Sequence, residues 1–158
     1  MADLLVKLYD LPPLQHAIDR VAEAGIIIKR PLVIERHLLV TWVEDRFGKC
    51  WADEVRMAFS SQAISCFIAL DKEASIVGFS CHNTTFKGFF GPTGVDESAR
   101  GKGIGSALLL RSLHAMSEDG YAYAVIGYSD ADEYYRKTVG AIPIPDSSPG
   151  PYRDRIGK

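Results

Sequence analysis

The sequence contains few cysteines and no long hydrophobic run. Its three cysteines, Cys50, Cys66 and Cys81, are odd in number and widely spaced, which argues against a disulfide framework and against a metal site built on paired cysteines. No apolar stretch reaches the length of a membrane-spanning helix, and the first residues lack the charged head and cleavage site of a signal peptide. We therefore expect a protein that lies outside the membrane, uses no metal and resides in a reducing cytoplasm.

An excess of charge of one sign is also missing. The 158 residues include 18 Lys and Arg against 20 Asp and Glu, which gives a formal net charge of −2. Without a general basic field, nucleic acid is not an expected partner. Hydrophobic residues make up 47% of the chain. A chain of this length and composition is expected to form one domain, residues 1–158, with a core of its own.

Apolar periodicity and turn residues predict both helices and strands. Strands are expected at residues 4–9, 26–30, 64–70, 74–83, 86–95, 121–128 and 141–144. Helices are expected at residues 14–24, 34–47, 51–60, 102–119 and 130–139, the last with Ser129 or Asp130 as its N-cap. This order predicts an α+β fold in which antiparallel strands precede a strand–helix–strand crossover. No structure is predicted for the tail from Pro145.

Glycine is concentrated at the start of one predicted helix. The segment Arg100-Gly-Lys-Gly-Ile-Gly-Ser106 places three alternating glycines and two cations just before an apolar helical stretch. Helix N-termini expose unpaired backbone N–H groups and the positive end of the helix dipole, and glycine lets a ligand approach the backbone closely. The combination favours a phosphate-bearing ligand.

Two common phosphate-binding motifs do not fit this loop. A P-loop has four residues between its glycines and then Gly-Lys-Ser/Thr, and that lysine position is not matched here. A dinucleotide fingerprint needs a third glycine where Leu108 stands, and it opens the first strand–helix–strand unit of its fold. This loop instead follows antiparallel strands two-thirds along the chain, so neither nucleotide fold is expected.

The loop resembles that of the GNAT superfamily of acetyl-CoA-dependent N-acetyltransferases. The family's pyrophosphate-loop motif, Arg/Gln-x-x-Gly-x-Gly/Ala, is matched at every fixed position by Arg100 to Gly105. A second segment, residues 121–128 followed by 130–141, is similar to the family's fifth strand and fourth helix, with an aromatic-Tyr-x-Lys pattern before Gly140. The spacing from Tyr135 to Gly140 is one residue longer than is commonest.

This resemblance covers roughly residues 26–144 and implies a fold. The expected architecture is a mixed, mostly antiparallel central sheet flanked by helices, with splayed fourth and fifth strands. Residues 1–24 are then an N-terminal extension, either an accessory strand and helix or an oligomer contact, so that a homodimer is one expectation. Residues 145–158 form a tail.

The resemblance also implies how acetyl-CoA is bound. Backbone N–H groups of the glycine loop would hold its pyrophosphate, with added charge from Arg100 and Lys102. Pro92 cannot donate a ladder hydrogen bond, so residues 91–95 fit a broken fourth strand whose Val95 N–H donates to the thioester carbonyl. The expected cofactor-binding residues are Val95, Arg100, Gly101, Lys102, Gly103, Ile104, Gly105 and Ser106.

One catalytic residue is implied as well. Tyr135 is placed where the family has a tyrosine that can protonate the departing CoA thiolate as a general acid. Its neighbour Tyr134 is then expected in the core, because adjacent helical residues point about 100° apart. No general base is evident. The predicted strand 86–95 contains no Asp or Glu, the two carboxylates after it fit the loop equally well, and a strand histidine such as His82 is more often packed or solvated than catalytic.

These expectations support two functions of different kinds. The first is transfer of an acetyl group from acetyl-CoA to a primary amine of a small molecule, or less readily of a protein. Direct transfer in a ternary complex is expected, since Cys81 has no matched histidine for an acyl-enzyme. Trp42, Phe47 and Trp51 lie on the helices that would roof the acceptor pocket, where they either line it or pack in the core. The second function is a non-catalytic acyl-CoA-binding or regulatory domain.

Overall fold

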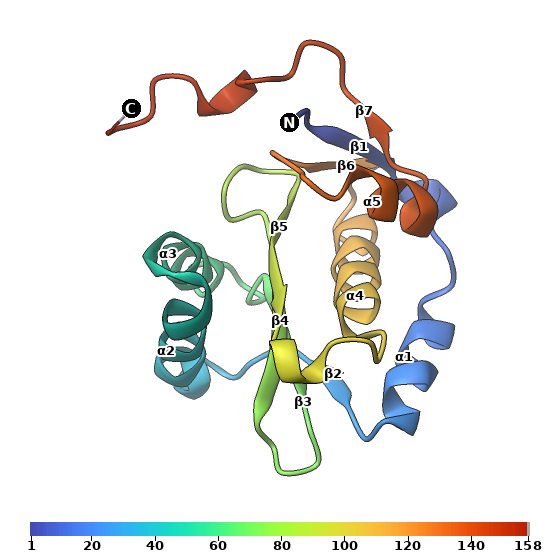
Figure 1. The fold of residues 1–158 in the computed structure, drawn as a ribbon, viewed down its shortest axis with the longest axis vertical. Coiled ribbons are helices and arrows are strands. Elements are labelled where there is room, and N and C mark those ends of the chain that lie inside the picture. Colours follow the sequence, from blue (N-terminus) through green and yellow to red (C-terminus); the bar gives the residue numbers. More distant parts are fainter. Residues whose placement is uncertain (158) are drawn as a thin grey trace.

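The computed structural model describes residues 1–157 as a seven-stranded sheet with helices on both faces (Figure 1). The strands are β1 (Leu4–Lys7), β2 (Ile27–Lys29), β3 (Cys66–Leu70), β4 (Ile76–His82), β5 (Phe89–Val95), β6 (Tyr123–Ile126) and β7 (Ile142–Pro143). The helices are α1 (Leu14–Glu23), α2 (Arg36–Phe47), α3 (Lys49–Ala58), α4 (Ile104–Glu118) and α5 (Asp132–Val139), with 3-10 turns η1 (Leu8–Asp10), η2 (Val33–Glu35), η3 (Glu97–Ala99) and η4 (Gly150–Tyr152). The predicted α+β elements are therefore present.

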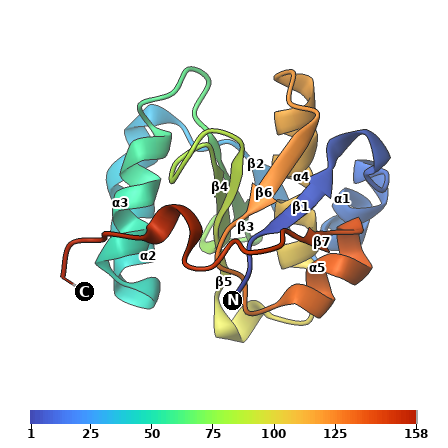
Figure 2. The ribbon, with the colours of Figure 1, turned by 90° about the horizontal axis from the view of Figure 1, so that it is seen from above.

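The sheet lies between two helical layers. Helices α2 and α3 cover one face, and α1 and α4 cover the other, as the two views show (Figures 1 and 2). Strand β3 is buried on both sides: Cys66 and Ile68 pack towards α2 and α3, while Phe67 and Ala69 pack towards α1 and α4. This follows from the alternation of side chains along a strand, and it explains why β3 is a continuous apolar run.

The strand order along the sheet is β2-β3-β4-β5-β6-β1-β7, so the first strand of the chain lies near its end. Strand β1 is antiparallel to both neighbours, with Leu4 opposite Ile126 of β6 and Leu5 opposite Ile142 of β7. Its side chains Leu4 and Val6 are buried in a core shared with α4. Residues 1–24 therefore contribute a strand to the sheet and a helix to the helical layer, which corresponds to the first of the two alternatives expected for this segment.

The expected splay between the family's fourth and fifth strands is found between β5 and β6. These two strands are the parallel pair of an otherwise antiparallel sheet, and their register is Phe89 to Val125 and Phe90 to Ile126. Within residues 1–157, no pairing between them continues past Phe90, where Gly91 and Pro92 follow. A gap thus opens between the end of β5 and the segment after β6.

The C-terminal part differs in detail from the sequence prediction. Helix α5 begins at Asp132 rather than Asp130, its N-cap position is Ala131, and Ser129 Oγ instead accepts a hydrogen bond from the Ala131 N–H at 3.0 Å. The tail after β7 crosses towards the α2 and α3 side of the molecule (Figure 2). There the Tyr152 ring packs against the Phe86 ring, with centroids 6.0 Å apart.

Candidate acetyl-CoA and active site

The loop between β5 and α4 adopts the conformation that its glycines favour. Gly101 and Gly103 have φ angles of +85° and +83°, in the left-handed region that glycine accepts without steric cost. Gly103 is the N-cap of α4, and no side chain among residues 1–157 caps that helix start. The N–H groups of the first turn of α4 are consequently available to an anion.

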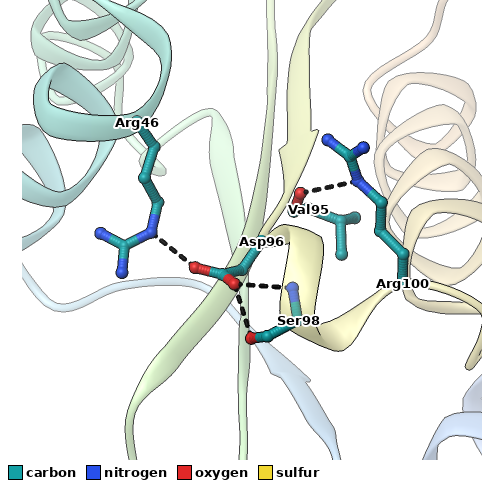
Figure 3. Close-up of polar contacts among 5 residues, drawn as sticks. All are labelled: Arg46, Val95, Asp96, Ser98 and Arg100. Atoms are coloured by element: carbon teal, nitrogen blue, oxygen red, sulfur yellow. Dashed lines mark hydrogen bonds and ion pairs between the residues drawn. The ribbon is translucent and has the colours of Figure 1, made fainter.

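The backbone of Val95 faces the gap between β5 and β6. In the antiparallel register of β4 and β5, Val95 stands opposite Gly78, and the next residue, Asp96, donates its N–H to the Val77 carbonyl at 2.9 Å. Hydrogen-bonded and non-hydrogen-bonded pairs alternate in such a ladder, so Val95 and Gly78 form a non-hydrogen-bonded pair. The N–H and C=O of Val95 therefore point away from β4. Arg100 Nε donates to that carbonyl at 3.3 Å (Figure 3).

Asp96 fixes the end of β5 in place (Figure 3). Its Oδ1 accepts hydrogen bonds from the Ser98 hydroxyl at 2.6 Å and the Ser98 N–H at 3.0 Å, and its Oδ2 accepts one from Arg46 Nε of α2 at 2.6 Å. The Ser98 hydroxyl, followed by Arg46, lowers the pKa of this carboxyl group to about 2. A carboxylate so fully engaged is a poor proton acceptor, so we assign Asp96 a role in holding the loop.

A cavity of about 440 Å³ unites the elements of the predicted site. Its lining includes seven of the eight predicted cofactor residues and the predicted general acid: Val95, Arg100, Gly101, Gly103, Ile104, Gly105, Ser106 and Tyr135. The eighth, Lys102, is exposed outside this lining. Residues at the end of β5 and on α5 thus share one hollow with the start of α4.

The two adjacent tyrosines of α5 both line this cavity, which corrects the expectation that Tyr134 belongs to the core. The Tyr134 side chain is 40% exposed, and its hydroxyl lies 2.9 Å from Ser106 Oγ at the start of α4. Tyr135 is half-buried, and its ring packs against the core around Leu109 and Val139. Burial, followed by the proximity of Tyr134 and Asp130, raises the pKa of Tyr135 to about 12, so this phenol keeps its proton at neutral pH.

A second, smaller cavity of about 190 Å³ lies along the same gap. It shares Trp51, Thr93 and Tyr135 with the larger cavity, so these residues form the boundary between the two hollows. The rest of its lining comes from residues 90–92 and from the segment after β6: Ile126, Gly127, Tyr128, Ser129 and Asp130. An exposed carboxylate, Asp130, therefore stands in a hollow with aromatic walls.

Two of the three aromatic residues proposed for the acceptor roof do reach the site. Phe47 and Trp51 line the larger cavity, and their rings stack with centroids 5.2 Å apart. Gly94 of β5 permits this arrangement, since a Cβ there would lie 2.6 Å from Phe47 Cζ. Trp42 instead packs with the apolar core between α2, α3 and the sheet.

One cation at the loop was missed by sequence reasoning. The Arg20 side chain of α1 lies against the backbone of Gly103, where a Cβ would be 3.0 Å from its Cδ, Nε and Cζ atoms. No carboxylate in the part of the chain that the structure describes lies within 4.0 Å of Arg20. The sequence offered no signal for it, because the resemblance to the family begins after α1.

His82, which was considered as a base, lies away from this site. It is 2% exposed and lines neither of the two cavities at the gap. Among residues 1–157, no group of three or more His, Cys, Asp or Glu side chains is arranged to hold a metal ion. No helix within the same residues is long and apolar enough to cross a membrane.

Comparison with known proteins identifies the family. Residues 35–141 match the acetyltransferase (GNAT) family. Because this match spans more than half of the chain, the protein belongs to the GNAT acetyltransferase family, whose members are generally acetyl-CoA-dependent N-acetyltransferases. A comparison with curated proteins found no match.

Solved structures with the same fold are distant in sequence. The GCN5-related glucosamine N-acetyltransferase region of a fungal multi-domain GH3 β-N-acetylglucosaminidase is 14% identical, with a TM-score of 0.75 over 90% of this chain and 19% of that one. A GCN5-related N-acetyltransferase from Sphaerobacter thermophilus is 18% identical, with a TM-score of 0.70 over 90% of this chain and 48% of that one. A third, from Kribbella flavida, is 16% identical, with a TM-score of 0.55 over 90% and 53%. The present chain thus spans about half or less of these relatives.

Proposed function

We propose that this protein transfers an acetyl group from acetyl-CoA to a primary amine of a small molecule. The observation that carries the proposal is the direction of the Val95 N–H, which points from β5 into the gap. The start of α4 and Tyr135 line the same cavity as Val95. In this proposal the co-substrate lies along the gap, with its pyrophosphate at Gly101 to Ser106. The cavity volume of about 440 Å³ and the left-handed glycines support this fit.

The proposed chemistry uses two groups of the chain on the thioester. The Val95 N–H donates a hydrogen bond to the carbonyl oxygen and stabilises the negative charge that develops there. The neutral acceptor nitrogen attacks the carbonyl carbon, which forms the C–N bond and breaks the C–S bond. Tyr135 gives its proton to the departing thiolate, and the proton that the nitrogen loses after its attack restores the phenol, directly or through water. The position of Tyr135 between the two cavities suits this role. Arg100, Lys102 and Arg20 neutralise phosphate charge.

The acceptor is proposed to enter through the smaller cavity. Its walls combine Trp51 and Tyr128 with the Asp130 carboxylate, a combination that favours a cationic amine. Asp130 is also the acidic residue of this lining, so it is our candidate for the group that takes the proton from the attacking ammonium, directly or through water. The three free cysteines are compatible with the cytoplasmic location that we propose.

The first experiment measures CoA release from acetyl-CoA with a thiol reagent, across amino acids, polyamines, aminoglycosides and short peptides. Release that depends on one class of amine, together with acetylated product detected by mass spectrometry, supports the enzyme. Heat stabilisation by acetyl-CoA with no release for any amine would argue for the binding-only alternative. Absence of both effects would refute the assignment of the site.

A further inference from the structure

A third cavity, of about 270 Å³, lies away from the gap between β5 and β6. Its lining joins the residue after β2, the segment before β3, the end of β4 and the residue after α4: Arg30, Ser61, Gln62, Ala63, Ser65, His82, Asn83 and Asp119. None of these eight residues lines either of the two cavities at the gap. Polar and charged side chains dominate this lining, so the cavity is a separate hollow of different chemistry.

Two polar atoms at this cavity are buried without partners. Ser65 is 5% exposed and His82 is 2% exposed. Ser65 Oγ and His82 Nδ1 have no hydrogen-bond partner within residues 1–157. A buried hydroxyl or ring nitrogen has given up its hydrogen bonds to water, so native structures nearly always provide a replacement. Both residues line the same hollow, so a single guest whose oxygens reached both atoms would satisfy them.

Two guanidinium groups lie against the aromatic ring that stacks on His82. The guanidinium carbons of Arg30 and Arg111 lie 4.8 and 4.4 Å from the centroid of the Phe67 ring, and that ring also stacks on His82 at 6.0 Å. Within the described chain, neither arginine has a carboxylate within 4.0 Å. Arg30 lines the cavity and Arg111 does not, and Glu118 acts on Arg111 as an opposing charge, so Arg30 is the guanidinium that the cavity presents.

The His82 ring is neutral in this setting. Burial, and after it the charge of Arg30, lowers its pKa to about 4, with Arg111 acting in the same direction and Asp119 opposing both. A neutral imidazole carries one N–H, and in the tautomer with the proton on Nδ1 the unpartnered ring nitrogen is a hydrogen-bond donor. The hollow therefore presents donors from a guanidinium, a hydroxyl and an imidazole.

We propose that this cavity binds a small oxyanion whose oxygens accept hydrogen bonds from Arg30, Ser65 and His82. A guanidinium fork suits carboxylate and phosphate oxygens equally in geometry. Asp119 also lines the cavity, and its negative charge disfavours a doubly charged phosphate more than a singly charged carboxylate. A carboxylate is thus the preferred ligand, and the site is independent of the acetyl-CoA site.

The histidine rings provide a local test by NMR. The chain has four histidines, and of these His82 lines this cavity, whereas His16, His37 and His114 do not. Acetate is titrated against sodium chloride at equal ionic strength, and inorganic phosphate is titrated in a second series. We expect acetate to shift the His82 ring signals saturably, with a dissociation constant on the order of 1 mM, and to raise the pKa of that ring. A saturable shift with phosphate instead would assign the site to phosphate.

Variants separate this site from general salt effects. Arg30→Gln should weaken acetate binding by about tenfold, equivalent to about 1.4 kcal/mol, while Arg56→Gln on α3 should leave it unchanged. Ser65→Ala is a milder second variant if Arg30→Gln does not fold. If the His82 signals move no more with acetate or phosphate than with chloride, or if both variants bind as tightly as the original chain, the proposal is overturned and the two atoms hold ordered water only.

Discussion

The hydroxyl of Tyr134 and that of Ser106 lie 2.9 Å apart, which joins α5 to the first turn of α4 at the edge of the larger cavity. The two adjacent tyrosines of α5 therefore occupy different positions in the cavity. Tyr134 stands over the turn that is proposed to hold phosphate, whereas Tyr135 lies at the boundary with the smaller cavity, where the thioester is proposed to lie. The two positions lead to different expected effects of the same substitution.

Tyr135→Phe should lower kcat by about 100-fold while leaving the affinity for CoA near that of the original chain. The change removes the proposed proton donor and little of the packing against the core cluster that includes Leu109. Steady-state kinetics with the best amine, together with calorimetric CoA binding, would test this. Tyr134→Phe is the matched control, and we expect it to raise KM for acetyl-CoA more than it lowers kcat. Equal kcat for Tyr135→Phe and the original chain would show that Tyr135 is structural.

The same phenol predicts the behaviour at high pH. Tyr135 is active as the protonated acid, and its pKa is raised to about 12, mainly by burial. Its contribution to kcat should therefore persist as pH rises and be lost only near that pKa, well above the range of an ordinary tyrosine at about 10. We therefore expect kcat of the original chain not to decline through ionisation of Tyr135 between about pH 7 and pH 10. A decline in this range that disappears in Tyr135→Phe would contradict the assignment.

Gly103→Glu should weaken CoA binding by about 100-fold, because several charge-assisted hydrogen bonds of roughly 1.5–3 kcal/mol each are at stake. The new side chain would collide with Arg20, force a left-handed backbone on a glutamate and bring a negative charge to the phosphates. Gly120→Glu is the matched control, since Gly120 also has a positive φ, of +100°, but faces open space after α4. Isothermal calorimetry compares the two variants. Equal CoA affinity for both would remove the loop from the site.

Arg20→Ala should weaken CoA binding by about fivefold at low salt, equivalent to about 1 kcal/mol for an exposed charge pair. The difference from the original chain should shrink as salt is added, because exposed charges are screened. Gln15→Ala on the same helix controls for changes in α1, since Gln15 bonds only to Asp19 on that helix. A loss of affinity that is the same at high and low salt would point to a structural effect of Arg20.

Asp96→Asn should destabilise the protein by about 0.5–1 kcal/mol at neutral pH. The pKa of Asp96 is lowered to about 2 in the folded state, so its ionic contacts contribute stability above the unfolded pKa of about 4. That contribution is lost as pH falls from about 4 to about 2, where Asp96 becomes protonated. Urea unfolding at several pH values should show the two proteins converging in this range. A difference that stays constant down to about pH 2 would contradict the ionic explanation.

The sequence predicts the elements and the glycine loop well, because both depend on local signals. Periodic apolar residues define α4, and the alternating glycines before it mark a place where a left-handed backbone and an uncapped helix start coincide. The broken strand could likewise be predicted from Pro92, whose missing N–H rules out regular pairing. Each of these inferences needs only residues that are neighbours in the chain.

The parts that escaped prediction depend on contacts between distant segments. Nothing near Arg20 in the sequence says that its side chain will rest on Gly103, 83 residues further along. Helical spacing could not show that both Tyr134 and Tyr135 line the cavity, because this depends on how α5 sits against the start of α4 and the end of β5. The N-cap of α5 was misplaced because Ser129 bonds to the turn before the helix rather than to its first residues.

The position of β1 has a consequence for how the chain is made. During synthesis the first strand emerges early, yet its hydrogen-bonding partners are β6 and β7, more than a hundred residues later. Until residues 123–143 have left the ribosome, Leu4 and Val6 have no sheet to join and remain exposed apolar surface. Closing so long a loop is slow relative to the local hairpin of β3 and β4. The half of the sheet formed by β6, β1 and β7 should therefore be completed last, so that the gap proposed for acetyl-CoA exists only after β1 has joined β6 and β7.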